Sequence, residues 1–384
     1  MSARCVLVII LLAAVPLTAR AQDRPRIRDL GVSPGVLSPG SLNAITDVSG
    51  VRVGHRTLVQ GDAVRTGVTA ILPHGGNLYH ESVPAAVYVG NGFGKAAGFL
   101  QVQELGTIET PIVLTNTLSV GTAIEGVVQW TLEQPGNADV RSVNAVVGET
   151  NDGYLNDIRG QHVTPDDVTA AIEHAHGGSV DEGSVGAGTG TRALGWKGGI
   201  GTSSRRLPDA LGGGIVGALV QANYGGILRI DGVPVGETLG RYAYRDVLTS
   251  DADADTDASG SDAHDDGSCM IVLATDAPIS PRNLRRMATR AIQGLARTGS
   301  FMSNGSGDFV IAFSTHNRRT GQDVRTDTLR ANHRMSPLFL ATVEAVEEAV
   351  YNALTAATTV RGRDGHVSEA LPLDRLRPLL TPTE

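Results

Sequence analysis

The peptide bond between Gly267 and Ser268 carries the most specific chemical signal in the sequence. It joins an acidic tract rich in Asp, Ala, Ser and Gly, residues 251–266, to an apolar run, residues 269–274. The tract has too little apolar surface to order itself, whereas the run is typical of a buried strand. If this bond were cut, Ser268 would become an N-terminus anchored at the start of a strand.

A Ser hydroxyl is a weak nucleophile and needs a neighbouring base. The α-amino group of an N-terminal Ser can be that base, because its reference pKa of about 7.7–8.0 lies near neutral pH. Gly267 has no Cβ and so tolerates the backbone geometry in which the Ser268 hydroxyl attacks the preceding carbonyl. Hydrolysis of the resulting ester would release the new terminus. The alternative interpretation of this dipeptide is a Gly-Ser turn within a linker.

Metal and cofactor chemistry has weaker support. His174 and His176 are two apart on an expected helix and so face different directions, and the sequence has no HExxH or paired-Cys spacing. The glycine-rich run of residues 186–199 lacks the G-x-G-x-x-G spacing, and Lys197 is followed by Gly rather than by Ser or Thr. We therefore expect no metal site and no cofactor, and we interpret these glycines as turns and close backbone packing.

Two other nucleophile arrangements are weaker than Ser268. Cys269 is a lone thiol in an apolar strand, which is more often a small buried hydrophobe than a catalytic group. Strand alternation places it on the opposite face from Ser268 and Met270. A Ser-His-Asp triad could draw on ten histidines, yet no G-x-S-x-G elbow is present.

The N-terminus predicts export. Residues 1–21 combine Arg4, an apolar run and a small-x-small site ending at Ala21, which is typical of a signal peptide and of a periplasmic protein. Its removal takes Cys5 away and leaves Cys269 as the sole cysteine, so no intramolecular disulfide is expected. The net charge of −8 over 384 residues, and the lack of any other apolar run of about 18 residues, indicate neither nucleic acid nor membrane as a partner.

The elements that must position Ser268 alternate between strand and helix patterns. After a polar, proline-punctuated arm at residues 22–42, short β-branched runs predict strands at residues 51–53, 67–72, 86–89, 112–114, 142–147, 269–275 and 309–315. Helix patterns cover residues 94–105, 120–133, 166–175 with Thr164 as N-cap, 281–298 with Ser280 as N-cap, and a long stretch beginning at Pro337. The last helix is expected to be amphipathic, with Phe339, Val343, Val346, Val350 and Leu354 on its apolar side. An α+β fold with layered sheets fits this pattern better than a barrel.

Several motifs in combination resemble the DmpA family of self-processing N-terminal-serine aminopeptidases, which includes the L-aminopeptidase/D-esterases and the β-peptidyl aminopeptidases. The similar stretches span nearly all of the chain after the signal peptide. They are NAITD at 43–47, GVRVGH at 50–55, ETNDGYLND at 149–157, GAGTGT at 186–191, KGGIGTSSR at 197–205, QANYG at 221–225, ATDAP at 274–278 and NGSGD at 304–308.

The resemblance implies a four-layer αββα sandwich, like that of N-terminal-nucleophile hydrolases but differently connected. It implies one catalytic domain cut between Gly267 and Ser268, with a large chain portion at residues 43–248, a disordered acidic linker at 249–267 and a small chain portion at 268–384. The processed heterodimers are expected to form a homo-oligomer, commonly a tetramer. The acidic tract is longer and more acidic than the family pattern, and a solvated variable loop is its simplest interpretation.

Site roles follow from the same motifs. The resemblance makes Ser268 the nucleophile, and Ser306 and Asp308 assist its activation. Asn223 and Tyr154 stabilise the oxyanion or orient the substrate, which suits neutral amide and phenol donors. Family members can carry Glu where this chain has Asp308.

The acidic residues Glu149 and Asp152, chosen from charge and position, are candidates for binding the ammonium group of the substrate.

The leading hypothesis is a serine hydrolase that removes N-terminal residues from short peptides, amides or esters through an acyl-enzyme on Ser268. One alternative is an uncleaved binding homologue without catalysis. Another is an amino-acid acyltransferase of related fold, in which the nucleophile is a self-generated N-terminal Thr. Ser268 and the signal peptide argue against that enzyme. The preference among L-, D- and β-amino-acid substrates depends on pocket shape rather than on the catalytic set.

Overall fold

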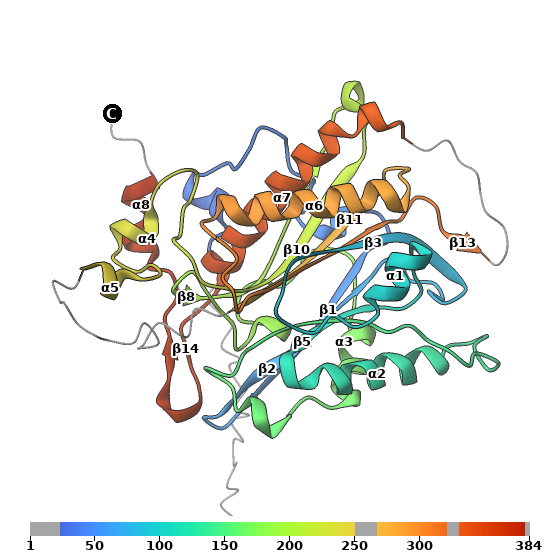
Figure 1. Cartoon of the computed structure of the whole chain (residues 1–384), viewed down its shortest axis with the longest axis horizontal. Helices are drawn as coiled ribbons and strands as arrows, with labels where there is room; N and C mark the ends of the chain where they lie inside the picture. Colours follow the sequence, from blue (N-terminus) through green and yellow to red (C-terminus); the bar gives the residue numbers. More distant parts are fainter. Residues whose placement is uncertain (1–23, 250–266, 321–329, 381–384) are drawn as a thin grey trace, which may run out of the picture.

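The computed structural model describes residues 24–249, 267–320 and 330–380 (Figure 1). The expected signal peptide, residues 1–21, lies outside the described residues. So does nearly all of the expected acidic linker, since only residues 249 and 267 at its two ends are described.

The largest sheet has seven strands and contains Ser268. Its strands run in the order β13-β3-β12-β11-β10-β9, and β4 pairs with β3. Their bounds are β3 Glu81–Gly92, β4 Thr107–Ile108, β9 Gly199–Arg206, β10 Ile215–Asn223, β11 Ser268–Thr275, β12 Gly307–Ser314 and β13 Arg319–Thr320. The β11–β12 pair is parallel and the other pairs are antiparallel. Ser268 therefore opens a strand with neighbours on both sides.

A second sheet of four strands lies against the first. Its order is β1-β2-β5-β6, with bounds β1 Arg52–Gln60, β2 Val64–Leu72, β5 Ile112–Asn116 and β6 Val146–Thr150. A buried apolar cluster joins the facing sides of the two sheets, with Ile71 and Leu114 from one sheet and Met270 and Val272 from the other. The face of β11 that carries Met270 and Val272 is thus covered by the four-stranded sheet.

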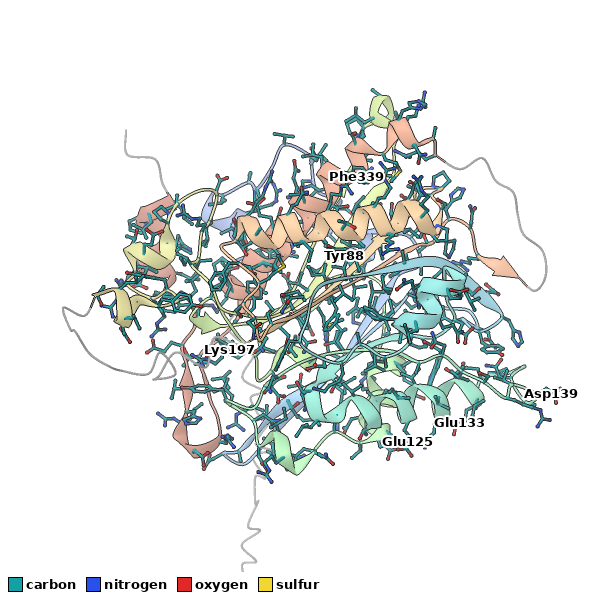
Figure 2. The ribbon with its side chains drawn as sticks, in the orientation of Figure 1. Tyr88, Glu125, Glu133, Asp139, Lys197 and Phe339 are labelled. Atoms are coloured by element: carbon teal, nitrogen blue, oxygen red, sulfur yellow. The ribbon has the colours of Figure 1, made fainter. Side chains whose placement is uncertain are left out.

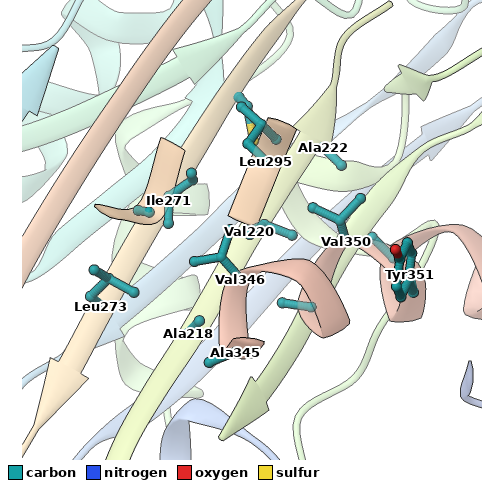
Figure 3. Packing of buried hydrophobic residues seen from close by; sticks show 14 of the residues in the cluster. Ala218, Val220, Ala222, Ile271, Leu273, Leu295, Ala345, Val346, Val350 and Tyr351 are labelled. Atoms are coloured by element: carbon teal, nitrogen blue, oxygen red, sulfur yellow. The ribbon is translucent and has the colours of Figure 1, made fainter. Parts of the chain in front are cut away.

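Helices cover the outer faces of both sheets and complete four layers. The helices α6 Pro281–Arg297 and α7 Ser336–Ala356 pack on the seven-stranded sheet, while α2 Val120–Leu132 and α3 Pro165–Glu173 pack on the four-stranded sheet (Figure 1). Figure 3 shows the outer cluster, in which Val346 and Val350 of α7 meet Val220 of β10 and Ile271 of β11. The α+β fold with an αββα order of layers is confirmed.

Short elements complete the chain. They are α1 Phe99–Leu105, α4 Val235–Thr238, α5 Arg245–Thr249, α8 Leu373–Leu380, the paired strands β7 Arg192–Ala193 and β8 Trp196–Lys197, and the hairpin β14 Val360–Arg361 and β15 Val367–Ser368. Among the described helices, none combines the length and apolar character needed to cross a membrane.

The predicted helices exist with small shifts. Thr164 and Ser280 cap α3 and α6 as expected, each accepting a hydrogen bond from a backbone N–H three residues on. The helix α3 ends at Glu173, so His174 follows it as the C-cap and His176 lies beyond it, paired with Val53. The expectation that both histidines sit on the helix is therefore wrong.

The prediction for α7 is too narrow. All residues from 341 to 355 are buried, rather than one apolar side only. Glu344 accepts backbone hydrogen bonds from Val36 and Leu37 of the N-terminal arm, and Glu348 pairs with Arg28 at 2.7 Å. The arm at residues 24–42 therefore covers the side of α7 that carries Glu344 and Glu348 and shields it from solvent.

Candidate active site

Ser268 is held at the edge of the space between the two sheets. It is 5% exposed and lies directly opposite Asn223, the last residue of β10. Directly opposite residues of antiparallel strands point to the same face. The Ser268 hydroxyl and the Asn223 amide therefore share one face, and the Ser268 Oγ accepts a hydrogen bond of 3.2 Å from the backbone N–H of Gly307.

Two glycines make this approach of backbone and hydroxyl possible. A Cβ at Gly267 would lie 1.9 Å from the carbonyl oxygen of Asn223, far inside contact distance. A Cβ at Gly307 would lie 2.5 Å from the carbonyl oxygen of Phe93 and 3.1 Å from the Ser268 Oγ. Only glycine fits before Ser268, and the Gly267–Ser268 bond therefore packs closely against the backbone of Asn223 at the end of β10.

Asn223 and Tyr154 stand on the wall beside this bond. The Asn223 Oδ1 accepts a hydrogen bond of 2.9 Å from the backbone N–H of Arg192, and its Nδ2 donates to the carbonyl of Asn151 at 3.0 Å. These two hydrogen bonds fix the orientation of the Asn223 amide, with Oδ1 toward Arg192 and Nδ2 toward Asn151. The Tyr154 ring stacks on His366 with centroids 4.5 Å apart, and the Arg192 guanidinium lies 4.0 Å from the Tyr154 centroid.

Ser306 and Asp308 approach the start of β11 from the neighbouring strand. Asp308 pairs with Cys269 in the parallel register, and both Ser306 and Asp308 are buried. The Ser306 hydroxyl and both Asp308 carboxylate oxygens have no hydrogen-bond partner among the described residues. Buried acceptors without partners are rare in folded proteins. This corner can therefore receive a donor such as an ammonium group.

The environment of Asp308 also sets its protonation. Burial raises the pKa of Asp308 to about 6, because a carboxylate loses hydration there. The Ser306 hydroxyl lies near enough to oppose this rise, although it is outside hydrogen-bonding geometry. Near neutral pH the Asp308 carboxylate is therefore mostly charged.

Both acidic candidates for substrate binding are buried. The Glu149 Oε1 accepts a hydrogen bond of 2.9 Å from the backbone N–H of Lys95, and its Oε2 accepts one from the Thr117 hydroxyl. A Cβ at Gly94 would lie 2.8 Å from the Glu149 Oε1, so this carboxylate packs against Gly94, the residue after Phe93. Since Phe93 lines the cavity described below, Glu149 is close to the cavity wall.

Asp152 lies deeper. Asn156 donates to its carboxylate at 3.0 Å, and burial raises the pKa of Asp152 to about 7, opposed by hydrogen bonds from Thr66, Asn156 and Asn116. It is not among the residues that line the cavity. Glu149 does not line the cavity either, so ammonium binding by either acid stays a prediction.

A cavity of about 390 Å³ opens beside Gly267. Asn223 and Tyr154, two of the predicted site residues, both line it, so the fold brings them together. The other lining residues are Phe93, Asn151, Gly153, Gly190, Arg192, Ala193, Leu194, Gly195, Tyr224, Gly225, Gly267, Arg363 and His366. The sequence prediction missed the two arginines and the histidine of this set, Arg192, Arg363 and His366. Arg192 directly follows the GAGTGT stretch and could have been noticed, whereas Arg363 and His366 reach the cavity only through folding of the β14–β15 hairpin.

The remaining candidate nucleophile and ligands lie elsewhere. Cys269 is buried in the cluster beneath α6 and α7, on the face opposite to Met270, and burial raises the pKa of its thiol. Over the described part of the chain, no group of three or more His, Cys, Asp or Glu side chains is placed to hold a metal ion.

Comparison with known proteins places these features in a family. Residues 43–368 match the family model for peptidase family S58. The chain is 41% identical over 384 aligned residues to the β-peptidyl aminopeptidase BapA of Sphingosinicella microcystinivorans, covering 94% of this chain and 93% of the relative.

Two solved structures have the same fold. The PH0078 protein from Pyrococcus horikoshii OT3 superposes with a TM-score of 0.83 at 46% identity, covering 93% of this chain and 98% of the other. The L-aminopeptidase D-Ala-esterase/amidase from Ochrobactrum anthropi, described as a variant of the Ntn-hydrolase fold, gives 0.81 at 37% identity with the same coverage. The chain therefore belongs to peptidase family S58 and is an aminopeptidase of the N-terminal-nucleophile type.

Proposed function

We propose that this aminopeptidase cuts its own Gly267–Ser268 bond and then uses Ser268 as its N-terminal nucleophile. The observation that carries the proposal is the position of Ser268. It opens a buried central strand opposite Asn223. On the neighbouring strand, Asp308 pairs with Cys269, and the side chains of Ser306 and Asp308 have no hydrogen-bond partner among the described residues, which supports assigning them to the freed amino group.

Self-cleavage would proceed by an N-to-O acyl shift. The Ser268 Oγ adds to the Gly267 carbonyl carbon as its proton is removed, and the C–N bond then breaks as the nitrogen takes up a proton. Water hydrolyses the ester, which leaves a carboxylate on Gly267 and an amino group on Ser268. The tight fit of Gly267 against the Asn223 carbonyl supports this step, because it holds the scissile bond in one place.

In turnover the new amino group accepts the proton of the Ser268 hydroxyl while Oγ attacks the substrate carbonyl. The amino group then passes the proton to the departing amine, and water releases the acyl group by the same route in reverse. Asn223 and Tyr154 are assigned to the oxyanion, since both are neutral donors on the cavity wall. Loss of one such donor typically raises the barrier by about 2.7–4 kcal/mol.

The substrates are short peptides, amides or esters with a free N-terminus, and Glu149 and Asp152 remain the candidates for binding the ammonium group. The name of the Sphingosinicella relative, β-peptidyl aminopeptidase, supports including β-amino acids in the tested range. We also infer export to the periplasm and assembly as a tetramer of processed heterodimers. The N-terminal pattern of residues 1–21 supports the first inference, and the family resemblance supports the second.

The test is turnover of a panel of L-, D- and β-amino-acid p-nitroanilides. The wild-type protein is expected to hydrolyse at least one class, and Ser268→Ala to lose this activity to background. The matched control is Cys269→Ala, which removes the adjacent thiol on the opposite face and is expected to keep the activity. Full turnover by Ser268→Ala, or loss confined to Cys269→Ala, would overturn the assignment of the nucleophile.

A further inference from the structure

The loop that carries Ser306, residues 298–306, joins α6 to β12 and lies outside any helix or strand. Its first residues, 298–299, accept backbone hydrogen bonds of 2.9 and 3.0 Å from the segment at residues 227–229. Further along, Met302 has a φ of 51°, in the left-handed region that long side chains seldom adopt. The end of the loop that carries Ser306 must therefore be held in place by other parts of the fold.

The strand β3 supplies the contacts at that end. The Asn91 Nδ2 lies 3.1 Å from the carbonyl oxygen of Ser303, 3.2 Å from that of Asn304 and 2.5 Å from that of Ser306. The three carbonyls share the two protons of this amide. The backbone N–H of Phe93 also donates to the Ser306 carbonyl, at 3.3 Å. The Ser306 carbonyl is thus held by two donors from one segment.

A β-bulge in β3 lies directly before Asn91. Asn91 pairs with Asp308 of β12, and the next pair is Val89 with Phe309. Gly90 is therefore an extra residue on β3, and a Cβ there would lie 3.4 Å from the Asp308 carbonyl oxygen. Bulges redirect side chains and are common beside active sites. This bulge sets the direction of the Asn91 side chain relative to the loop.

The contact with Ser306 reaches the nucleophile through one peptide unit. The Ser306 carbonyl and the Gly307 N–H belong to the same peptide unit, and that N–H donates to the Ser268 Oγ at 3.2 Å. A trans peptide unit is planar, and its C=O and N–H point to opposite sides. The direction of the carbonyl therefore fixes the direction of the N–H. By binding the carbonyl, Asn91 determines where this donor points.

We propose that Asn91 is a positioning residue, which holds the Ser306–Gly307 peptide unit so that the Gly307 N–H keeps the Ser268 hydroxyl in place for attack. Such positioning matters because a displacement of about 1 Å can cost about a hundredfold in rate. Asn91 precedes Ser268 in the chain and the loop follows it, so the contact would join the two cleaved chains at the site. This inference rests on the proposed use of Ser268 as the nucleophile.

The first test separates kcat from KM for the best anilide substrate. Leu has a branched shape similar to that of Asn but no donor. Neither Asn91 nor Ser306 lines the cavity, so Asn91→Leu should slow the reaction without weakening substrate binding. We expect kcat to fall by about ten- to a hundredfold per molecule that has a free Ser268 N-terminus, with KM within about threefold of the wild type. Intact-mass analysis gives the number of such molecules.

A second variant tests the donor itself. Asn91→Asp keeps the shape of the side chain and places a carboxylate oxygen where the amide donates. A carboxylate is an acceptor only, so it cannot hold the three carbonyls. We expect kcat to fall at least as far as in Asn91→Leu.

The matched control is Asn77→Leu. Asn77 is half-buried like Asn91, and its Nδ2 donates to the Pro135 carbonyl at 3.0 Å and to the Asn137 Oδ1 at 2.7 Å. It lies before the other end of β3, so the same substitution removes similar hydrogen bonds away from the site. We expect Asn77→Leu to keep the wild-type kcat. An equal loss of kcat in both Leu variants would show that stability, and not position, causes the effect.

Hydrogen exchange tests the positioning without relying on activity. Asn91→Leu is compared with the parent protein in a Ser268→Ala background, so that both proteins have the same cleavage state. We expect exchange at residues 303–307 to be at least about threefold faster in the variant, because the loop opens locally more often. Exchange in α6 is expected to be unchanged.

The outcomes separate the two proposals. Unchanged exchange at residues 303–307, or a wild-type kcat in Asn91→Leu or Asn91→Asp, would overturn the role of Asn91 and leave the aminopeptidase standing. A raised KM with unchanged kcat would do the same. A variant that stays uncut while exchange in α6 is unchanged supports the role, because self-cleavage needs the same hydroxyl in place. If the wild type hydrolyses no substrate, the proposed function fails, and the role of Asn91 in it fails too.

Discussion

At the scale of single residues, the proposed mechanism depends on an interaction between Asp308 and the freed amino group of Ser268. The carboxylate of Asp308 is buried one register position from Ser268, and burial raises its pKa to about 6. In its charged form it attracts and orients the amino group. In its protonated form it does not. Activity therefore needs Asp308 deprotonated, and a new ammonium group nearby would hold its pKa at or below about 6.

We accordingly expect kcat/KM to rise with pH through a limb at or below about pH 6 and to fall as Asp308 gains its proton in more acid solution. Asp308→Asn should lose at least about tenfold in kcat/KM and should lack this limb, while Asp308→Glu should retain a limb because it keeps a titrating carboxylate. Rates measured from about pH 4 to about pH 9 give the comparison, because this interval spans the reference pKa values of a carboxyl group and of a terminal amino group. An unchanged acid limb in Asp308→Asn would mean that another group controls it.

Much of the site could be predicted residue by residue. Asn223 and Tyr154 line one cavity, and Ser306 and Asp308 lie at the start of β11, as the motifs suggested. Arg363 could not be predicted, because its place depends on a hairpin whose docking partner, Leu155, is more than two hundred residues earlier in the chain. A motif describes local chemistry, whereas such a contact exists only in the folded chain.

At the scale of elements, the glycine-rich segment between α3 and β9 is a packing device rather than a phosphate site. Lys197 of β8 is completely buried, and its Nζ donates to the carbonyls of Gly188 and Gly198 at 2.8 Å each. Figure 2 shows Lys197 inside the molecule, in contrast to Glu125 and Glu133 on the outer side of the chain. Burial lowers the pKa of Lys197 to about 7, and the charge of Asp152 opposes that shift.

Lys197→Met is expected to destabilise the protein by about 2–5 kcal/mol, because two buried carbonyls lose their donor and the buried Asp152 loses a nearby positive charge. The change should appear as a lower midpoint in urea unfolding. Lys95→Met is the control, because the side chain of Lys95 is exposed, and it should stay within about 0.5 kcal/mol of the wild type. Equal stability of both variants would show that the donor at Lys197 is dispensable.

Elements with strong local signals were predicted well, and those without them were not. The helix α6 has a capping Ser280, a proline start and a regular apolar face, and all of these are observed. The strands β9 and β10 were not predicted, since β9 is built largely from Gly, Ser and Thr and only neighbouring strands stabilise it. The helix α7 was expected to be amphipathic, but its glutamates are buried with Arg205 and Arg28, which come from distant segments.

At the scale of the whole molecule, cleavage would divide the chain without dividing the fold. The strands β11 and β12 belong to the portion after Ser268, yet they lie between β10 and β3 of the portion before it. The helix α7 adds a buried ionic contact, in which Arg205 pairs with Glu344 at 3.0 Å and with Glu348 at 2.8 Å. The two portions share one core and should not fold as separate domains.

The two processed chains are therefore expected to stay together in native size-exclusion chromatography and to separate only under denaturing conditions. The physical reason is that separation would expose both faces of β11, all of whose residues are buried. Comparison of native elution with a denaturing gel of the same fractions provides the measurement. Separate native elution of the small chain would contradict the shared core.

The central claim is that Ser268 becomes an N-terminus, and intact-mass analysis with N-terminal sequencing of the purified protein tests it most directly. The account predicts two polypeptides, one of which begins Ser268-Cys269-Met270-Ile271, and a single uncut polypeptide for Ser268→Ala. A wild-type protein that hydrolyses its substrates while uncut, or one cut at another bond, would contradict it.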